Sequence, residues 1–166
     1  MLRMTSEHDE LLHMLNEQRR MLRITMRGLT AADAVKRTTV SELTLGGVLK
    51  HLTRGELGYT HILTEQPGMP DGILDTGQYV WDGDSFEELL AAYAEAGRAT
   101  DAAVRAADLD KLVPMPPAPW DPNPEPWTIR RIVLRVFQET AHHSGHADII
   151  REALDGASTT AQLFSD

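Results

Sequence analysis

The sequence contains no cysteine, and this absence excludes several kinds of chemistry at once. A disulfide framework, a thiolate metal site and a cysteine nucleophile all require that residue. Any thiol chemistry would therefore use a thiol from another molecule. Basic residues are also in deficit, since 16 Lys and Arg face 25 Asp and Glu for a formal net charge of −9. Because sequence-independent nucleic-acid binding depends on Lys and Arg neutralising phosphates, we expect no nucleic-acid partner.

Long apolar runs are missing as well. No uninterrupted run approaches the roughly 20 residues that a bilayer requires. The N-terminal region mixes Glu7, Asp9 and Glu10 with its apolar residues, so it has no signal-peptide core. We therefore expect a cytoplasmic protein with no membrane partner. With 166 residues and 42% hydrophobic content, residues 1–166 are expected to form a single domain.

Four segments carry apolar residues at the 3.6-residue period of a helix, separated by stretches rich in Pro, Gly and Asp. Each segment begins at a residue that favours the N-cap position. The expected starts are after Thr5 or Ser6, near Thr44, at Ser85 and at Thr128, and the expected ends are Gly28, about Gln66, before Asp108, and Gly156. The first helix should bury a stripe of Leu11, Leu15, Leu22 and Met26. The pattern predicts an all-α fold, a four-helix bundle.

The two longest connections predict the order of the helices. Residues 67–84 are numerous enough to run the length of a bundle, so the second and third helices can be parallel, in an up-down-down-up arrangement. Seven of the nine prolines fall between Pro114 and Pro126, which predicts an ordered, polyproline-like strap. This strap is either a loop packed over a bundle end or a lid over a site.

A polar stripe interrupts the apolar face of the last helix. Arg135, Glu139, His143 and His146 are spaced 4, 4 and 3 residues apart, which places them on one face. Burying Glu139 as a bare carboxylate would be costly. Arg135 alone could offset that cost as an ion pair, but the two imidazoles on the same stripe favour a divalent cation bound by Glu139 and His143.

One helix cannot complete such a site, and His51 is the best candidate for the remaining ligand because it lies on the inner stripe of the second helix. Gly47, Gly55 and Gly58 flank it. Since glycine costs roughly 1 kcal/mol against alanine in a helix interior, these three favour open volume beside His51, where a ligand or water could sit.

Two further residues have more than one interpretation. His146 is a fourth ligand, a hydrogen-bond donor behind a ligand, or an acid/base and proton shuttle. Arg135 either pairs with Glu139 or meets an anionic group of a substrate. We predict that His146 and Arg135 serve catalysis, whereas His8, His13, His61 and His142 lie on the surface or in packing contacts.

Two motifs resemble a known family. The run from Gln138 to Glu152, ending in Leu154-Asp155-Gly156, is similar to the C-terminal signature of the DinB-like four-helix-bundle superfamily. Lys50-His51-Leu52 followed by Glu56 resembles that superfamily's second-helix motif, and the spacing agrees over residues 6–156.

The resemblance implies an up-down-down-up bundle with zinc or nickel held by His51, Glu139 and His143. Many members have histidine at the middle position, where this sequence has Glu139. In this respect the chain resembles the branch related to thiol-dependent maleylpyruvate isomerases. That branch implies a transferase or isomerase that uses mycothiol or bacillithiol and a small electrophile. The alternative is a non-catalytic stress-response protein that binds a metal or a small molecule.

Apolar residues off the expected stripe of the first helix predict a homodimer. Leu12, Met14 and Met21 are off that stripe, so some of them should lie outside the bundle, and monomers seldom expose large apolar patches. The alternative is that the 67–84 connection covers them.

Overall fold

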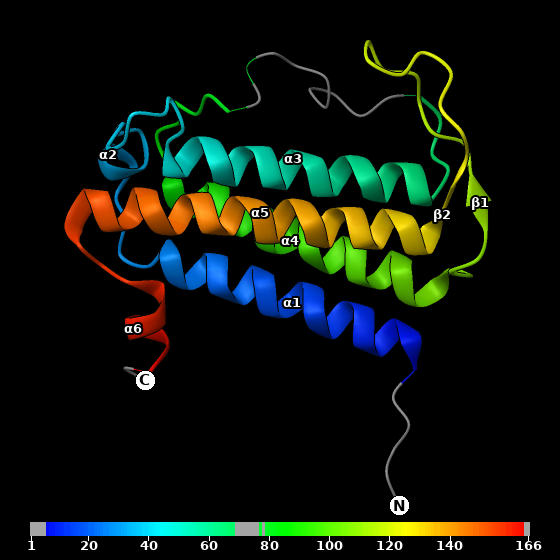
Figure 1. Ribbon diagram of the computed structural model, residues 1–166, viewed down its shortest axis with the longest axis horizontal. Helices are drawn as coiled ribbons and strands as arrows, with labels where there is room; N and C mark the ends of the chain where they lie inside the picture. Colours follow the sequence, from blue (N-terminus) through cyan, green and yellow to red (C-terminus); the bar gives the residue numbers. More distant parts are fainter. Residues whose placement is uncertain (1–5, 69–76, 78, 165–166) are drawn as a thin grey trace, which may run out of the picture.

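The computed structural model describes residues 6–68, 77 and 79–164. Its elements in chain order are α1 (Glu7–Thr25), α2 (Ala31–Ala34), α3 (Leu45–Leu63), α4 (Phe86–Ala106), β1 (Leu112–Val113), β2 (Trp127–Thr128), α5 (Ile129–Asp155) and α6 (Thr159–Leu163). Figure 1 shows α1, α3, α4 and α5 lying side by side, which confirms the expected four-helix bundle. No helix within these described ranges combines the length and the apolar character needed to cross a bilayer.

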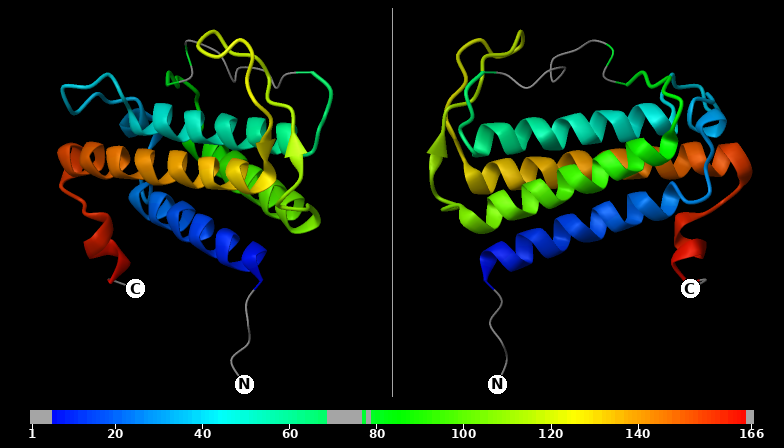
Figure 2. Two further views of the ribbon diagram at one scale, coloured as in Figure 1. Left: turned by 45° about the vertical axis from the view of Figure 1, so that its right-hand side comes forward. Right: turned by 180° about the vertical axis from the view of Figure 1, so that it is seen from behind.

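The chain direction alternates as the connection lengths predict. In Figures 1 and 2, α1 and α5 run one way along the bundle, whereas α3 and α4 both run the other way. α5 packs against α1 and α3, and α4 packs against α3 and α1. The up-down-down-up order is therefore confirmed. The connection between α3 and α4 has to return along the bundle, and its last residues, 79–85, come back to the N-terminal end of α3.

Each long helix starts at its expected N-cap. Ser6, Thr44, Ser85 and Thr128 all accept a hydrogen bond from the backbone N–H three residues on. This contact satisfies an amide that has no partner inside the helix. Two ends differ from the prediction: α1 stops at Thr25, before Gly28, and α3 stops at Leu63, before Gln66. Glu65, with a φ of 54°, turns the chain out of the second of these helices.

The buried face of α1 is wider than the predicted one, since Leu15, Leu22 and Met26 are buried as expected and Leu12 is buried as well. Leu12 is only 2% exposed and packs with Leu63 and Val104, whereas Leu11 is half-buried. The expectation that Leu12 lies outside the bundle is therefore wrong, because α1 must meet both α5 and α4 and so buries a wider stripe. Met14 remains 46% exposed. The homodimer stays a prediction that now depends on Met14 and the half-buried Met21.

The proline-rich segment belongs to a hairpin. β1 and β2 pair antiparallel, with Leu112 opposite Thr128 and Val113 opposite Trp127. This short ladder is the departure from an all-α chain. Residues 114–126 form the loop between the strands, which rises from the end of the bundle where α5 begins (Figure 1). The segment is thus a loop at the end of the bundle, and both its packing over that end and its role as a lid stay predictions.

A buried polar cluster, which we call the core brace, joins three helices. It consists of Asn16 and Arg19 from α1, Glu56 from α3 and Asp101 from α4. Arg19 is 1% exposed and forms a two-point ion pair with Glu56. Its Nη1 donates to Asp101 Oδ1 at 2.7 Å and to Asn16 Oδ1 at 2.9 Å. Every member is satisfied by another, as burial requires.

Candidate metal centre

The three predicted ligands meet between α3 and α5. His51 lies in the first half of α3, and Glu139 and His143 lie one turn apart on α5. His51 Nε2 is 3.3 Å from Glu139 Oε2, and His143 Nε2 is 3.5 Å from the same oxygen. The three candidate ligand atoms all lie within 4.8 Å of one another. We call this group the His–Glu–His cluster.

The spacing of these atoms fits a divalent ion. Zinc binds imidazole nitrogen and carboxylate oxygen at about 2.0–2.2 Å, so neighbouring ligand atoms of a tetrahedral site are about 3.3–3.5 Å apart. Both distances to Glu139 Oε2 agree with that edge length. Two nitrogens and one oxygen, all able to donate a lone pair, therefore converge as the donor set of a zinc or nickel ion would.

Electrostatics keep Glu139 ionised. Hydrogen bonds from His143 and His51, opposed by burial and reinforced by the Arg135 charge, hold the pKa of this carboxyl well below its usual range. Arg135 Nη2 lies 2.6 Å from Glu139 Oε1, so the predicted i,i+4 pair is confirmed. The Arg135 pair engages one carboxylate oxygen and leaves the other directed at the histidines. Tyr59 from α3 accepts a hydrogen bond from Arg135 Nε at 3.4 Å.

His146 lies behind His143 and outside the cluster. Its Nδ1 is 3.2 Å from His143 Nδ1, on the side of the His143 ring opposite the nitrogen that faces Glu139. Burial, together with the charges of His143 and His142, lowers the pKa of His146. This placement fits a hydrogen-bond partner that orients His143, since ligand imidazoles commonly use their second nitrogen in this way.

The other histidines occupy the expected surface and packing positions. His142 and His13 are exposed, His8 contacts the carbonyl oxygen of Ala107, and His61 contacts that of Gly68. His142 nevertheless lies close to its neighbours, with its ring centroid 4.6 Å from that of His146. None of these four belongs to the His–Glu–His cluster.

The glycines of α3 lie in different surroundings, so glycine serves a different purpose at each position. A Cβ on Gly55 would meet no described atom within 4 Å, which agrees with open space near His51. At Gly47 that expectation is wrong, because a Cβ there would lie 1.9 Å from the carbonyl oxygen of Tyr79. Gly47 admits the backbone of the returning connection rather than a ligand or water. Gly58 is buried within α3.

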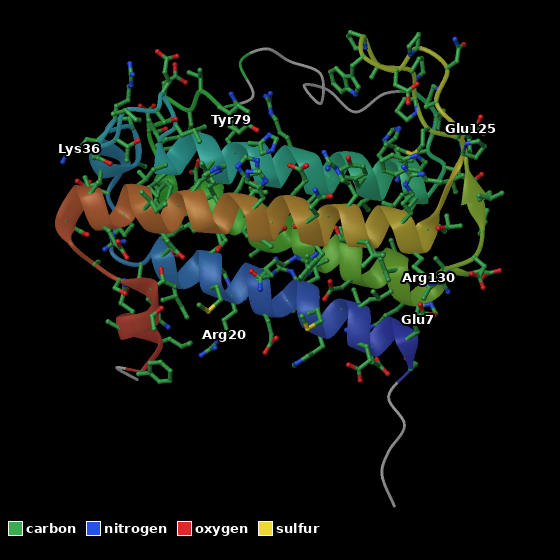
Figure 3. The ribbon with its side chains drawn as sticks, in the orientation of Figure 1. Glu7, Arg20, Lys36, Tyr79, Glu125 and Arg130 are labelled. Carbon is green, nitrogen blue, oxygen red and sulfur yellow. The ribbon has the colours of Figure 1, made fainter. Side chains whose placement is uncertain are left out.

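Sequence reasoning missed Tyr79, which belongs to the site. Its hydroxyl lies 3.4 Å from His51 Nε2 and 3.3 Å from His143 Nε2. Its ring stacks on His51 at 4.3 Å between centroids. In Figure 3 the labelled Tyr79 lies beside α3, on the face directed away from α1. The adjacent pair Gly46-Gly47 was the available signal, because paired glycines in a helix mark the close approach of another backbone.

Comparison with known proteins agrees with this geometry. The family model described as mycothiol-S-transferase matches residues 10–156, which includes all three cluster residues, His146 and Arg135. No curated protein and no solved structure gives a match to the chain. The matched span is most of the sequence, and the family is of the DinB-like type that the motifs on α3 and α5 resemble. The chain therefore belongs to the mycothiol-S-transferase family.

Proposed function

We propose that this protein is a metal-dependent S-transferase that joins the sulfur of mycothiol to a small electrophile. The observation that carries the proposal is the convergence of His51 Nε2, Glu139 Oε2 and His143 Nε2 in a chain of the mycothiol-S-transferase family. Of the two reaction types implied by the sequence, transfer is the one that the family description names. The lack of cysteine agrees with a thiol that arrives as a substrate.

His51, Glu139 and His143 would hold zinc or nickel. A divalent ion bound there supplies a positive charge that lowers the pKa of a nearby thiol, and the thiolate is the reactive nucleophile. In the reaction a carbon–sulfur bond forms, and the thiol proton leaves with the group that the electrophile loses. The proposal includes a cytoplasmic location, because low-molecular-weight thiols stay reduced in that compartment.

Arg135 and His146 act in this proposal as positioning residues. Arg135 holds Glu139 Oε1, which keeps Oε2 directed at the two histidines. His146 holds His143 Nδ1, which leaves Nε2 of His143 as the metal-facing nitrogen. Loss of either contact would loosen the ligands without removing one. We therefore expect Arg135→Gln and His146→Ala to weaken zinc binding about 10-fold, with the electrophile's KM less affected than metal affinity.

The test offers mycothiol and a chromogenic electrophile to protein purified without an affinity tag and loaded with zinc or nickel. Turnover should require the metal and disappear in His143→Ala while the circular dichroism spectrum is unchanged. His13→Ala, which removes a histidine from the exposed face of α1, is the matched control and should keep full activity. Metal binding without turnover for any thiol or electrophile would favour the non-catalytic binding protein. Absence of metal binding would overturn both functions.

A further inference from the structure

The Tyr79 hydroxyl lies beside both histidines of the His–Glu–His cluster. Its hydroxyl oxygen is 3.4 Å from His51 Nε2 and 3.3 Å from His143 Nε2. The corresponding distances from Glu139 Oε2 to these two nitrogens are 3.3 and 3.5 Å. Two oxygens therefore flank the same pair of nitrogens at nearly equal distances. These four separations match the edge of a tetrahedron around zinc, about 3.3–3.5 Å.

The backbone of Tyr79 is held against α3 by close packing. The carbonyl oxygen of Tyr79 fills the space that a side chain at residue 47 would need. Lys50 Nζ donates to the carbonyl oxygen of Val80 at 2.5 Å and to that of Gly77 at 3.3 Å. Lys50 thus ties Gly77 and Val80, which lie on either side of Tyr79 in the sequence, to the first half of α3.

A second contact fixes the next part of the same segment. Trp81 packs on Gly46, where a Cβ would lie 2.5 Å from a ring carbon of the indole. The Trp81 ring also meets Phe86 edge to face, with 5.7 Å between centroids, at the start of α4. The segment 79–81 therefore packs against Gly46 and Gly47 of α3 and is hydrogen-bonded to Lys50. The Tyr79 side chain therefore reaches His51 and His143 from a backbone that is fixed against α3 by packing and hydrogen bonds.

We propose that the Tyr79 hydroxyl occupies the fourth position around the metal in the resting protein and that a substrate thiol displaces it. The proposal rests on the metal site of the proposed function. The hydroxyl leaves the position as the sulfur enters, and the thiol proton passes to solvent. Tyr79 thereby fills the site when thiol is absent and sets the thiol affinity when it is present.

The probe is cobalt(II), whose visible absorption reports coordination, with 2-mercaptoethanol as the thiol. Cobalt affinity is measured by competition with a chromophoric chelator, and thiol binding by the sulfur-to-cobalt absorption in the near ultraviolet. Tyr79→Phe should bind cobalt about 10-fold more weakly and show an altered visible spectrum. It should also bind 2-mercaptoethanol several-fold more tightly, because no hydroxyl has to leave. Tyr93→Phe, which removes a hydroxyl from the core, is the matched control and should match the wild type.

A second pair of variants moves Tyr79 without changing it. Gly47→Ala places a methyl group against the Tyr79 carbonyl, so it should reproduce the Tyr79→Phe spectrum and thiol affinity with the hydroxyl still present. Gly55→Ala adds the same methyl group to the same helix without meeting Tyr79 or any other described atom within 4 Å, and should leave the cobalt spectrum unchanged.

The outcomes separate this proposal from the proposed function. Wild type that binds neither cobalt nor zinc overturns the metal site and this proposal with it. Wild type that binds cobalt and thiol, with Tyr79→Phe identical to it, overturns the role of Tyr79 and leaves the metal site standing. Weaker thiol binding in Tyr79→Phe also overturns displacement, because the hydroxyl would then be holding the thiol.

Discussion

Helix α3 contributes to two polar clusters that differ in how their charges are satisfied. In the core brace, Glu56 meets the guanidinium of Arg19, so donor faces acceptor. In the His–Glu–His cluster, His51 meets a carboxylate and a second imidazole, so three groups with lone pairs converge. His51 and Glu56 are five residues apart, about 140° around the helix, and therefore face different neighbours. Buried polarity alone does not mark a functional site; a convergence of groups that can each offer a lone pair to a metal is the stronger indication.

The two clusters also differ in their surroundings. Gly97 of α4 lies against Arg19, with a hypothetical Cβ only 3.3 Å from Nε, and Arg19 itself is almost completely buried. The Glu139 side chain is a quarter exposed. Gly55, one turn after His51 on α3, has open space beside it. The Arg19–Glu56 pair of the core brace is almost completely buried, whereas the carboxylate of the His–Glu–His cluster is partly exposed to solvent. Stability should therefore depend on the first and ligand binding on the second.

The largest expected effect breaks the core brace. Glu56→Ala leaves the Arg19 guanidinium buried without its two-point partner, so we expect a loss of about 3–5 kcal/mol in the free energy of unfolding. Urea denaturation measures it as a lower midpoint. Glu95→Ala removes the carboxylate of an exposed pair with Arg98 and is the control, with a loss below about 1 kcal/mol. A similar small loss in Glu56→Ala would contradict the structural role of the core brace.

The second prediction concerns the His–Glu–His cluster, whose removal should matter only when metal is present. Zinc at 100 times its Kd should stabilise the wild type by about 2.7 kcal/mol, seen as a higher Tm. Glu139→Gln should abolish most of this gain, measured against the metal-free Tm of the same variant. The measurement is a pair of thermal melts, with zinc and with chelator. An equal gain from zinc in Glu139→Gln would place the bound metal elsewhere.

The third prediction sharpens the contrast in packing. Gly97→Ala should lower stability by about 1 kcal/mol, because Arg19 is held between two carboxylates and cannot move away from the new methyl group. Gly55→Ala should raise stability by about 0.5–1 kcal/mol, since alanine favours the helix and its methyl group meets open space. Both values come from urea denaturation. If the two variants shift stability in the same direction, the packing contrast is wrong.

The smallest effect comes from a pair that belongs to neither cluster, formed by the buried Arg151 and the partly exposed Asp155. The hydrogen bond from Arg151 is the main cause of a lowered Asp155 pKa, beneath the ordinary 3.8. Because the folded pKa is the lower one, the pair stabilises the protein above about pH 3.8, and this contribution is lost as pH falls through the folded pKa. Asp155→Asn should cost at most about 0.5–1 kcal/mol at pH 7, since the carboxylate is partly exposed.

Stability measured from pH 7 down to pH 2 checks this sign. The curves of Asp155→Asn and wild type should converge in acid. A difference that grows as pH falls would mean that the pair is not the source of the effect.

Signals between residues close in the sequence were sufficient to predict where the long helices begin and that Glu139 and His143 belong to one site. Ser6, Thr44, Ser85 and Thr128 mark helix starts because an N-cap acts within one turn, so its effect can be read from neighbouring residues. Glu139 and His143 share one helix, and their spacing alone places them on one face.

Contacts between distant segments could not be read in the same way. Tyr79 comes to the site through a long connection, whose path no periodicity describes. The burial of Arg19 cannot be predicted from α1 alone, because its partners Glu56 and Asp101 lie on other helices. The sequence did not predict the β1–β2 ladder, because each strand has two residues and an alternating pattern needs more. Leu12 was placed outside because the width of the buried stripe depends on which helices α1 contacts.

The parallel direction of α3 and α4 has a consequence for how such a protein can diversify. A bundle with two parallel neighbours needs a segment that travels back along its side, and here that segment delivers Tyr79 beside ligands fixed on rigid helices. Surface connections tolerate insertions and substitutions far better than packed helices do. Under the proposed function, substitutions in the returning segment would change thiol preference while the helices that would bind the metal stay as they are.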